Sequence, residues 1–117
     1  MIVDDSPVFL AAATSLLEGQ GASVVGVAQT PDDAIRQVTE LSPDLTLLDV
    51  HLGAESGFEL AGRLFREVGV EPRRMVMIST DAGDDHAQLV SESPVAGFLT
   101  KTALSVSGIR ELMALEG

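Results

Sequence analysis

Five polar side chains in this 117-residue sequence stand at the ends of short apolar runs. They are Asp4 and Asp5 after "MIV", Asp49 at the end of "LTLLD", Ser79 at the end of "MVMIS", and Lys101 after "AGFLT". An unpaired carboxylate is costly to bury, so Asp49 must face solvent at a strand end, be paired, or bind a metal ion. Which of these holds depends on the elements that position the five residues.

The apolar runs alternate with segments of helical periodicity, which indicates β–α units and a parallel sheet. The expected strands cover residues 1–3, 23–28, 45–49, 75–79 and 96–100. The expected helices begin at Pro7 and Pro31, cover 57–68, lie around 83–91, and occupy the region of 109–115. Because the strand residues are nearly all apolar, helices are expected on both faces of the sheet. The sequence therefore predicts a doubly wound α/β fold.

Open parallel sheets bind ligands beyond the carboxyl ends of their strands, which is where all five polar residues are expected. Three carboxylates at one edge repel one another, and a divalent cation with oxygen ligands relieves that repulsion. We therefore predict a Mg²⁺ site with Asp5 and Asp49 as direct ligands and Asp4 acting through water. Lys101 and Ser79 would contact an anion beside Asp49. This arrangement suits phosphoryl transfer to an aspartate nucleophile.

The composition limits the class of protein. Hydrophobic residues make up 45% of the chain, cysteine is absent, and the formal net charge is −11. Without cysteine there is no disulfide framework or thiolate metal site, and the acidic charge argues against direct binding to nucleic acid. No apolar stretch is long enough to cross a bilayer, and no signal-peptide pattern is present. We therefore predict one cytoplasmic domain over 1–117 whose partners are metal ions or basic protein surfaces.

Four segments resemble the motifs of bacterial response-regulator receiver domains, of the kind that stand alone in chemotaxis signalling. They are "IVDDSP" (2–7), "LLDVHLGAESGFEL" (47–60), "VMIST" (76–80) and "GFLTKT" (97–102), in the order and at the spacing of that family. The resemblance covers the whole chain. It implies a flavodoxin-like, five-stranded parallel sheet with strand order 2-1-3-4-5, here with a shortened first strand.

The resemblance also implies a set of roles. Asp49 would accept a phosphoryl group from a histidine kinase or a phosphotransfer protein, and Asp5, Asp49 and the backbone carbonyl of His51 would hold Mg²⁺. Ser79 and Phe98 would act as switch residues. The fourth helix, fifth strand and fifth helix would bind a downstream protein, and a homodimer is an open alternative. Such a domain catalyses only its own phosphorylation and dephosphorylation, a small charge event that biases a two-state element.

Several positions depart from the family pattern. Thr102 stands where the family has a proline after a cis peptide bond; cis costs about 2.5–4 kcal/mol before other residues, so a trans bond is expected here. Gly53 replaces a proline and is expected to loosen the loop after Asp49. Thr80 is larger than the usual alanine or glycine, which predicts slow autodephosphorylation. The short first strand is expected to leave neighbouring backbone groups without partners.

Three other functions are weighed against this one. The chain could be a receiver-like module that docks partners without phosphorylation, or the receiver of a larger regulator with a DNA-binding domain. A phosphatase-like aspartyl hydrolase fits poorly, because His51 occupies the place of its second aspartate. Phe98 is equally compatible with simple core packing, and His51 and His86 are expected to be ordinary solvated residues. Residues 75–100 contain no lysine or arginine, so a partner that docks there is expected to carry positive charge.

Overall fold

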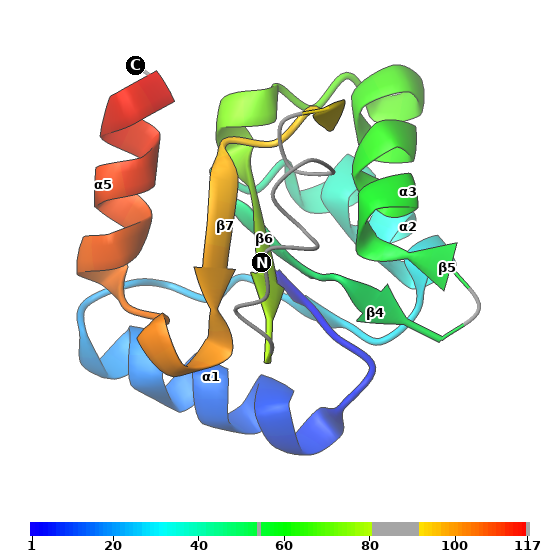
Figure 1. The fold of residues 1–117 in the computed structure, drawn as a ribbon. Coiled ribbons are helices and arrows are strands. Elements are labelled where there is room, and N and C mark those ends of the chain that lie inside the picture. Colours follow the sequence, from blue (N-terminus) through cyan, green and yellow to red (C-terminus); the bar gives the residue numbers. More distant parts are fainter. Residues whose placement is uncertain (54, 81–91, 117) are drawn as a thin grey trace.

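A computed structural model describes residues 1–53, 55–80 and 92–116, and its centre is a five-stranded parallel sheet (Figure 1). The strands lie in the order β2-β1-β3-β6-β7. Their bounds are β1 (Ile2–Val3), β2 (Val27–Ala28), β3 (Thr46–Asp49), β6 (Met75–Ser79) and β7 (Gly97–Thr100). Counted along the chain this is the order 2-1-3-4-5, so the predicted flavodoxin-like sheet and its short first strand are confirmed.

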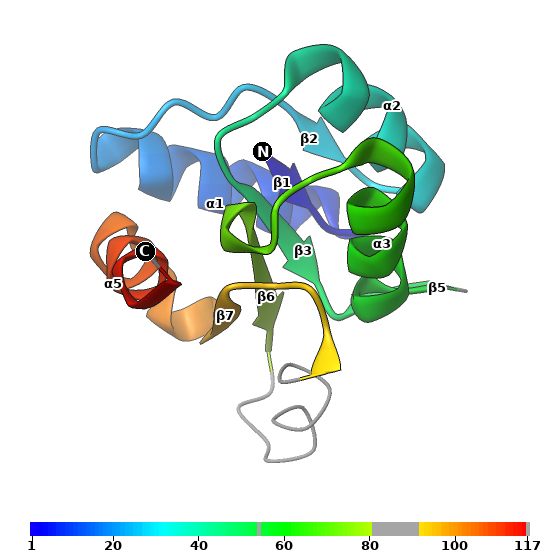
Figure 2. The same cartoon turned by 90° about the horizontal axis from the view of Figure 1, so that it is seen from above.

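The helices cover both faces of this sheet, as the apolar strands predict. Within the described residues they are α1 (Pro7–Gly19), α2 (Pro31–Leu41), α3 (Gly57–Arg63) with its π-helical continuation η1 (Leu64–Val68), and α5 (Val106–Glu116). Two 3₁₀ turns, η2 (Pro72–Arg74) and η4 (Lys101–Ala103), precede β6 and α5. Figure 2 shows α1 and α5 on one side of the sheet and α2 and α3 on the other. None of the helices in the described ranges is long and apolar enough to span a membrane.

Alternating strand residues build a separate core on each face. On β3, Leu47 belongs to the cluster under α1 and α5, whereas Leu48 belongs to the cluster under α2 and α3. On β6, Val76 and Met77 divide in the same way. This period of two is the one that a strand buried on both faces requires. The strands are thereby held rigidly beneath the residues that follow them.

Side-chain caps fix the points at which the helices begin. The hydroxyl of Ser6 accepts a hydrogen bond from Phe9 N (3.2 Å), and the hydroxyl of Thr30 accepts one from Asp33 N (3.2 Å). Pro7 and Pro31 follow these caps in the first helical turn, where the missing N–H has no intrahelical partner in any case. The predicted helix starts at Pro7 and Pro31 are therefore confirmed.

Some predicted bounds were wrong. The second strand is limited to Val27–Ala28 instead of 23–28, because its partner β1 offers only two residues for pairing. Within the predicted helix 57–68, the last five residues are wound as a π-helix. A short antiparallel hairpin of β4 (His51–Leu52) and β5 (Glu55–Ser56) follows β3 and was not predicted. The predicted helix around 83–91 lies outside the described residues, and so does His86.

The backbone at the amino end of β1 is better paired than the sequence suggests. The terminal amine of Met1 donates to Leu45 O (2.9 Å), Leu47 N donates to Met1 O (2.8 Å), and Ile2 N donates to Gly26 O (3.2 Å). The expectation that the neighbouring strands lack partners here was wrong for these groups. They link the first strand to both of its neighbours.

Gly57, the first residue of α3, lies against the backbone of β3. A β-carbon at this position would meet Asp49 O and would come within 2.8 Å of both Asp49 C and Met77 Cε. Backbone atoms cannot give way cheaply, so we expect Gly57→Ala to lower the free energy of unfolding by about 2 kcal/mol, measured by thermal or urea denaturation. Gly62→Ala is the matched control, because its β-carbon would meet only the mobile end of Arg66. Equal stability losses in the two variants would contradict this expectation.

Candidate functional site

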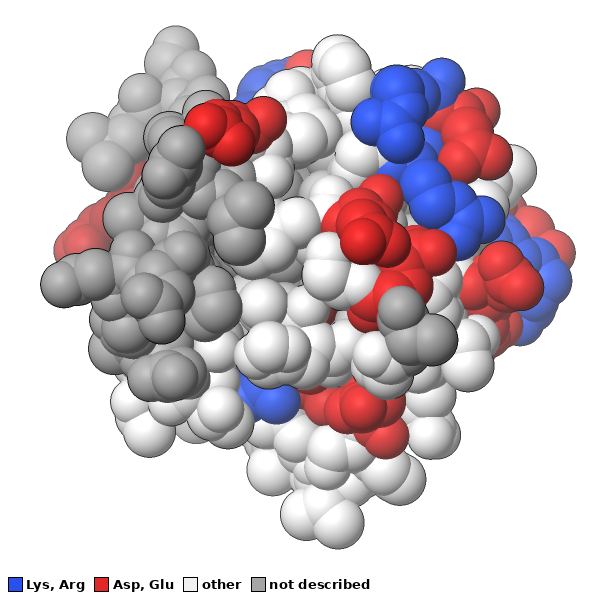
Figure 3. All heavy atoms as spheres, turned by 45° about the vertical axis from the view of Figure 1, so that its right-hand side comes forward, with Lys and Arg blue, Asp and Glu red and all other residues white. Residues whose placement is uncertain are grey.

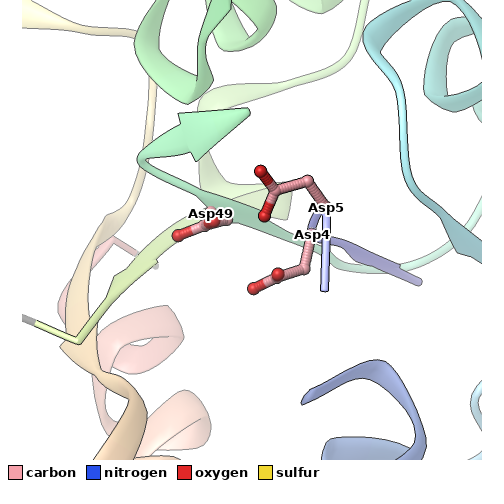
Figure 4. A group of neighbouring side chains, drawn as sticks. All are labelled: Asp4, Asp5 and Asp49. Atoms are coloured by element: carbon pink, nitrogen blue, oxygen red, sulfur yellow. The ribbon is translucent and has the colours of Figure 1, made fainter. Parts of the chain in front are cut away.

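Three carboxylates meet at the carboxyl edge of the sheet. One oxygen each from Asp4, Asp5 and Asp49 lies within 4.8 Å of the others. Figure 4 shows Asp4 and Asp5 extending from the end of β1 toward Asp49 at the end of β3. Asp4 and Asp49 are buried, with exposed fractions of 0% and 5%, whereas Asp5 is exposed. The predicted convergence of these residues is therefore present in the structure.

Strand register explains why the carboxylates meet. β1 and β3 are parallel neighbours in which Val3 pairs with Leu48, so the next residues along the two strands are Asp4 and Asp49. Asp4 N also donates to Ala28 O (3.0 Å), which extends the pairing with β2 by one step beyond β1. The apolar residues of the strands set this register by packing into the two cores. The register in turn places the two carboxylates next to each other.

Lys101 brings a cation to the same edge. It follows β7 and begins the 3₁₀ turn η4, whose first residues are capped by Thr100 through a hydrogen bond from Ala103 N (3.3 Å). Its Nζ lies 2.6 Å from Asp4 Oδ2 and 3.7 Å from Asp49 Oδ1. The described residues contain no cis peptide bond, so the Lys101–Thr102 bond is trans, as Thr102 predicts.

The surroundings of Asp49 disfavour its charged form. Burial is the main cause, the carboxylate of Asp4 adds to it, and together they raise the pKa of Asp49 to about 6. The ammonium of Lys101 and the backbone N–H of His51, which donates to the Asp49 carboxylate, act in the opposite direction. A raised pKa from burial and a like charge marks a site where additional positive charge would bind favourably.

Asp4 is paired on both of its oxygens. Its Oδ1 accepts a hydrogen bond from Ser6 N (2.8 Å), and its Oδ2 lies 2.6 Å from Lys101 Nζ. The three grouped carboxylates thus share one ammonium and keep a net negative charge when they are ionised. A negative, oxygen-rich site of this kind fits Mg²⁺ and its coordinated water.

Comparison with known proteins identifies the family. The sequence profile described as the response regulator receiver domain matches residues 1–112. The chain belongs to the response regulator receiver domain family. This receiver is 31% identical over 120 aligned positions to a protein-glutamate methylesterase/protein-glutamine glutaminase of Halalkalibacterium halodurans, covering 97% of this chain and 34% of that protein. It is 29% identical to the response regulator GacA of Pseudomonas aeruginosa, covering 97% of this chain and 54% of GacA.

Solved structures show the same fold. The signal receiver domain of a modulated diguanylate cyclase from Desulfovibrio desulfuricans matches with a TM-score of 0.77 and 27% identity, covering 99% of this chain and 95% of that one. A CheY-like receiver domain protein from Methanospirillum hungatei matches with a TM-score of 0.77 and 22% identity, over 99% and 95% of the two chains. The receiver spans about a third to a half of the length of the two full-length relatives named above.

The remaining predicted site residues are Ser79, Phe98 and His51. Ser79 is fully buried at the end of β6, where it pairs in register with Thr100, the residue before Lys101. Phe98 lies on β7, is partly buried and packs against the core under α2 and α3. His51 is exposed, and its backbone N–H donates to the Asp49 carboxylate.

Arg63 of α3 connects the hairpin β4–β5, which carries His51, to the helix through an ion pair. The Arg63 guanidinium lies 3.0 Å from Glu55 Oε1, 3.3 Å from Glu67 Oε2 and 3.5 Å from Asp32 Oδ1. Figure 3 shows arginine and acidic side chains interleaved over this side of the molecule. Gly53 has φ +72°, which proline cannot adopt. The loop after Asp49 is therefore a hairpin with an ion pair to α3, and the loosening by Gly53 stays a prediction.

We expect Arg63→Met to slow phosphorylation of Asp49 several-fold, because the hairpin that positions the His51 backbone loses its attachment to α3. Stability should change little, since two of the three acidic partners of Arg63, Asp32 and Glu67, are exposed. The rate is measured as the gain of phosphorylated mass with time in Mg²⁺ and acetyl phosphate. Arg36→Met is the control, because the partners of Arg36 within the described ranges are Asp33 and Glu40 on the surface of α2. Equal rates in both variants would show that the hairpin needs no such attachment.

Proposed function

We propose that this receiver is the phosphoacceptor of a two-component signalling system, in which a histidine kinase or a phosphotransfer protein phosphorylates Asp49. The observation that supports this most is the position of the Asp49 carboxylate, 3.7 Å from the Lys101 ammonium and within 4.8 Å of Asp4 and Asp5. Membership of the receiver family supports the same role. The proposed function does not include direct binding of the protein to nucleic acid or to a membrane.

In the proposed reaction a carboxylate oxygen of Asp49 attacks phosphorus, and the bond from phosphorus to the donor breaks. The Lys101 ammonium and the Ser79 hydroxyl bind the transferred phosphoryl oxygens. With a pKa of about 6, Asp49 is mostly ionised at neutral pH and able to act as the nucleophile. Asp5, Asp49 and the backbone carbonyl of His51 would hold Mg²⁺, with Asp4 acting through water; the metal ion supplies charge neutralisation at the phosphoryl group.

The consequences of phosphorylation belong to the same proposal. Ser79 and Phe98 would respond to the phosphoryl group and change the surface formed by β7, α5 and the preceding segment, where a downstream protein or a second copy binds. Thr80 beside Ser79 would slow hydrolysis of the phosphoaspartate. The receiver over 1–117 would act in the cytoplasm, with no catalysis beyond its own phosphorylation and dephosphorylation.

The direct test is the intact mass of the chain after incubation with Mg²⁺ and acetyl phosphate. A gain of roughly 80 Da, one phosphoryl group, is expected, and it should disappear when EDTA removes Mg²⁺. A folded chain that gains no mass under these conditions would instead act as a phosphorylation-independent docking module.

A second candidate function is that of the receiver segment of a larger regulator. The coverage of the relatives favours it, because the chain matches 34% of the methylesterase and 54% of GacA. Reading the gene on either side of the present sequence tests this candidate. Phosphorylation of Asp49 is expected in either case, and only the output differs.

A further inference from the structure

An aromatic ring lies against the site lysine. The Nζ of Lys101 is 4.2 Å from the centroid of the Phe9 ring, and the same Nζ lies 2.6 Å from Asp4 Oδ2. Neither the metal site nor the proposed phosphoryl transfer assigns any role to Phe9. The ammonium is thus held between a carboxylate and a ring face, and only 15% of the Lys101 side chain is exposed.

The ring and the carboxylate come from one short segment. Asp4 Oδ1 accepts a hydrogen bond from Ser6 N (2.8 Å), and the Ser6 hydroxyl accepts one from Phe9 N (3.2 Å). These two bonds fix the first turn of α1 relative to Asp4. The two groups that contact the ammonium are therefore held at a set separation by the local backbone.

We propose that Phe9 is a positioning residue that holds the Lys101 ammonium beside Asp4 and Asp49 through a cation–π contact. A lysine side chain is long and flexible, and its ammonium is strongly hydrated, so an ion pair alone fixes it poorly. Attraction to a ring face strengthens as water is excluded. The inference rests on the proposed function only for its kinetic consequence, which is that Lys101 is ready to bind the incoming phosphoryl group.

A simple packing role for Phe9 makes a different prediction. Phe9 is partly buried and packs against the core under α1 and α5. Leucine would keep most of that apolar contact but has no ring face for a cation. If Phe9 only fills space, Phe9→Leu should leave Lys101 where it is. If Phe9 positions Lys101, the ammonium should move even though the fold is kept.

The sequence offers a clean probe, because Lys101 is its only lysine. Isotope-labelled lysine therefore gives NMR signals from a single side chain. We expect ¹³C relaxation of the ε-CH₂ group to show an ordered side chain in the wild-type chain and in Phe9→Tyr, and the mobility of a free lysine in Phe9→Leu. Relaxation is the readout because loss of the ring would change the chemical shift even if Lys101 stayed in place. Val8→Ala is the control, because Val8 is the neighbouring residue and is 80% exposed. It should leave the signals unchanged.

The kinetic arm uses Mg²⁺ and acetyl phosphate. Phe9→Leu should slow phosphorylation by roughly three- to tenfold, Phe9→Tyr should recover most of the rate, and the Mg²⁺ concentration for half-maximal rate should stay constant. In a double-mutant cycle, Phe9→Leu should add nothing to Lys101→Ala. A further slowing in the Lys101→Ala background would overturn the proposal, since Phe9 would then act on the fold.

The two arms separate this proposal from the proposed function. If the chain takes up no phosphoryl group but the ε-CH₂ group is ordered and becomes mobile in Phe9→Leu, the proposed function fails and the positioning contact stands. If the ε-CH₂ group is equally ordered in the wild-type chain and in Phe9→Leu, the positioning contact is overturned, whatever the rate of phosphorylation.

Discussion

Asp49→Asn is expected to abolish phosphoryl incorporation completely, where the wild-type chain gains roughly 80 Da from acetyl phosphate in Mg²⁺. An amide cannot act as the anionic nucleophile that attacks phosphorus. The substitution would also remove one of the three carboxylates that are grouped within 4.8 Å, so the metal site loses a ligand together with the acceptor. Intact-mass measurement over a time course gives the result directly.

The neighbouring carboxylates are poor substitutes for Asp49. Asp4 is fully buried, and its two oxygens already face Ser6 N and the Lys101 ammonium. Asp5 is exposed and has no such contact with Lys101 among the described ion pairs. Asp5→Asn is therefore the matched control: it should still be phosphorylated, at a higher Mg²⁺ concentration. Undiminished labelling of Asp49→Asn would assign the acceptor role to another residue.

The parts of the fold that the sequence predicted are those decided by the buried apolar strands. The run 75–79 coincides with β6 because its residues are fully buried between two cores. The segment 23–28 was overextended, because a strand needs a partner and β1 supplies only Ile2 and Val3. Periodicity describes the face a residue presents, but it does not reveal how long the neighbouring strand is.

The same distinction applies to the site. The sequence alone predicted that three site residues meet, namely Asp4, Asp49 and Lys101, because parallel strands end at a common edge of the sheet. The hairpin β4–β5 was not predicted, because it depends on the positive φ of Gly53 and on the ion pair between Arg63 and Glu55, and no periodic pattern in the sequence reveals either one. The contact of Phe9 with Lys101 was also missed. Its only sequence signal is the position of Phe9 in the first turn of the helix that follows Asp5.

Asp49 is also expected to destabilise the receiver when no metal is bound. Its pKa is about 6 in the folded chain, against 3.8 for the unperturbed group. Above about pH 6 the carboxyl is charged in both states, and the folded state bears the full cost of that charge. As the pH falls from about 6 toward 4, the folded state takes up the proton first, so this cost declines. With allowance for screening at the rim of the site, the cost at neutral pH is about 2 kcal/mol.

Asp49→Asn should therefore be more stable than the wild-type chain by about 2 kcal/mol at pH 7.5 in EDTA, measured by urea denaturation, and the gain should shrink toward zero near pH 4. Mg²⁺ should reverse the order at pH 7.5, because only the wild-type chain keeps the full set of carboxylates; saturation at a hundredfold excess over the Kd stabilises it by about 2.7 kcal/mol. Asp44→Asn, which removes an exposed carboxylate near Arg74, controls for net charge. A gain that is the same at pH 5 and pH 7.5, or that Mg²⁺ leaves untouched, would mean that Asp49 bears no such charge cost and that the three carboxylates hold no metal ion.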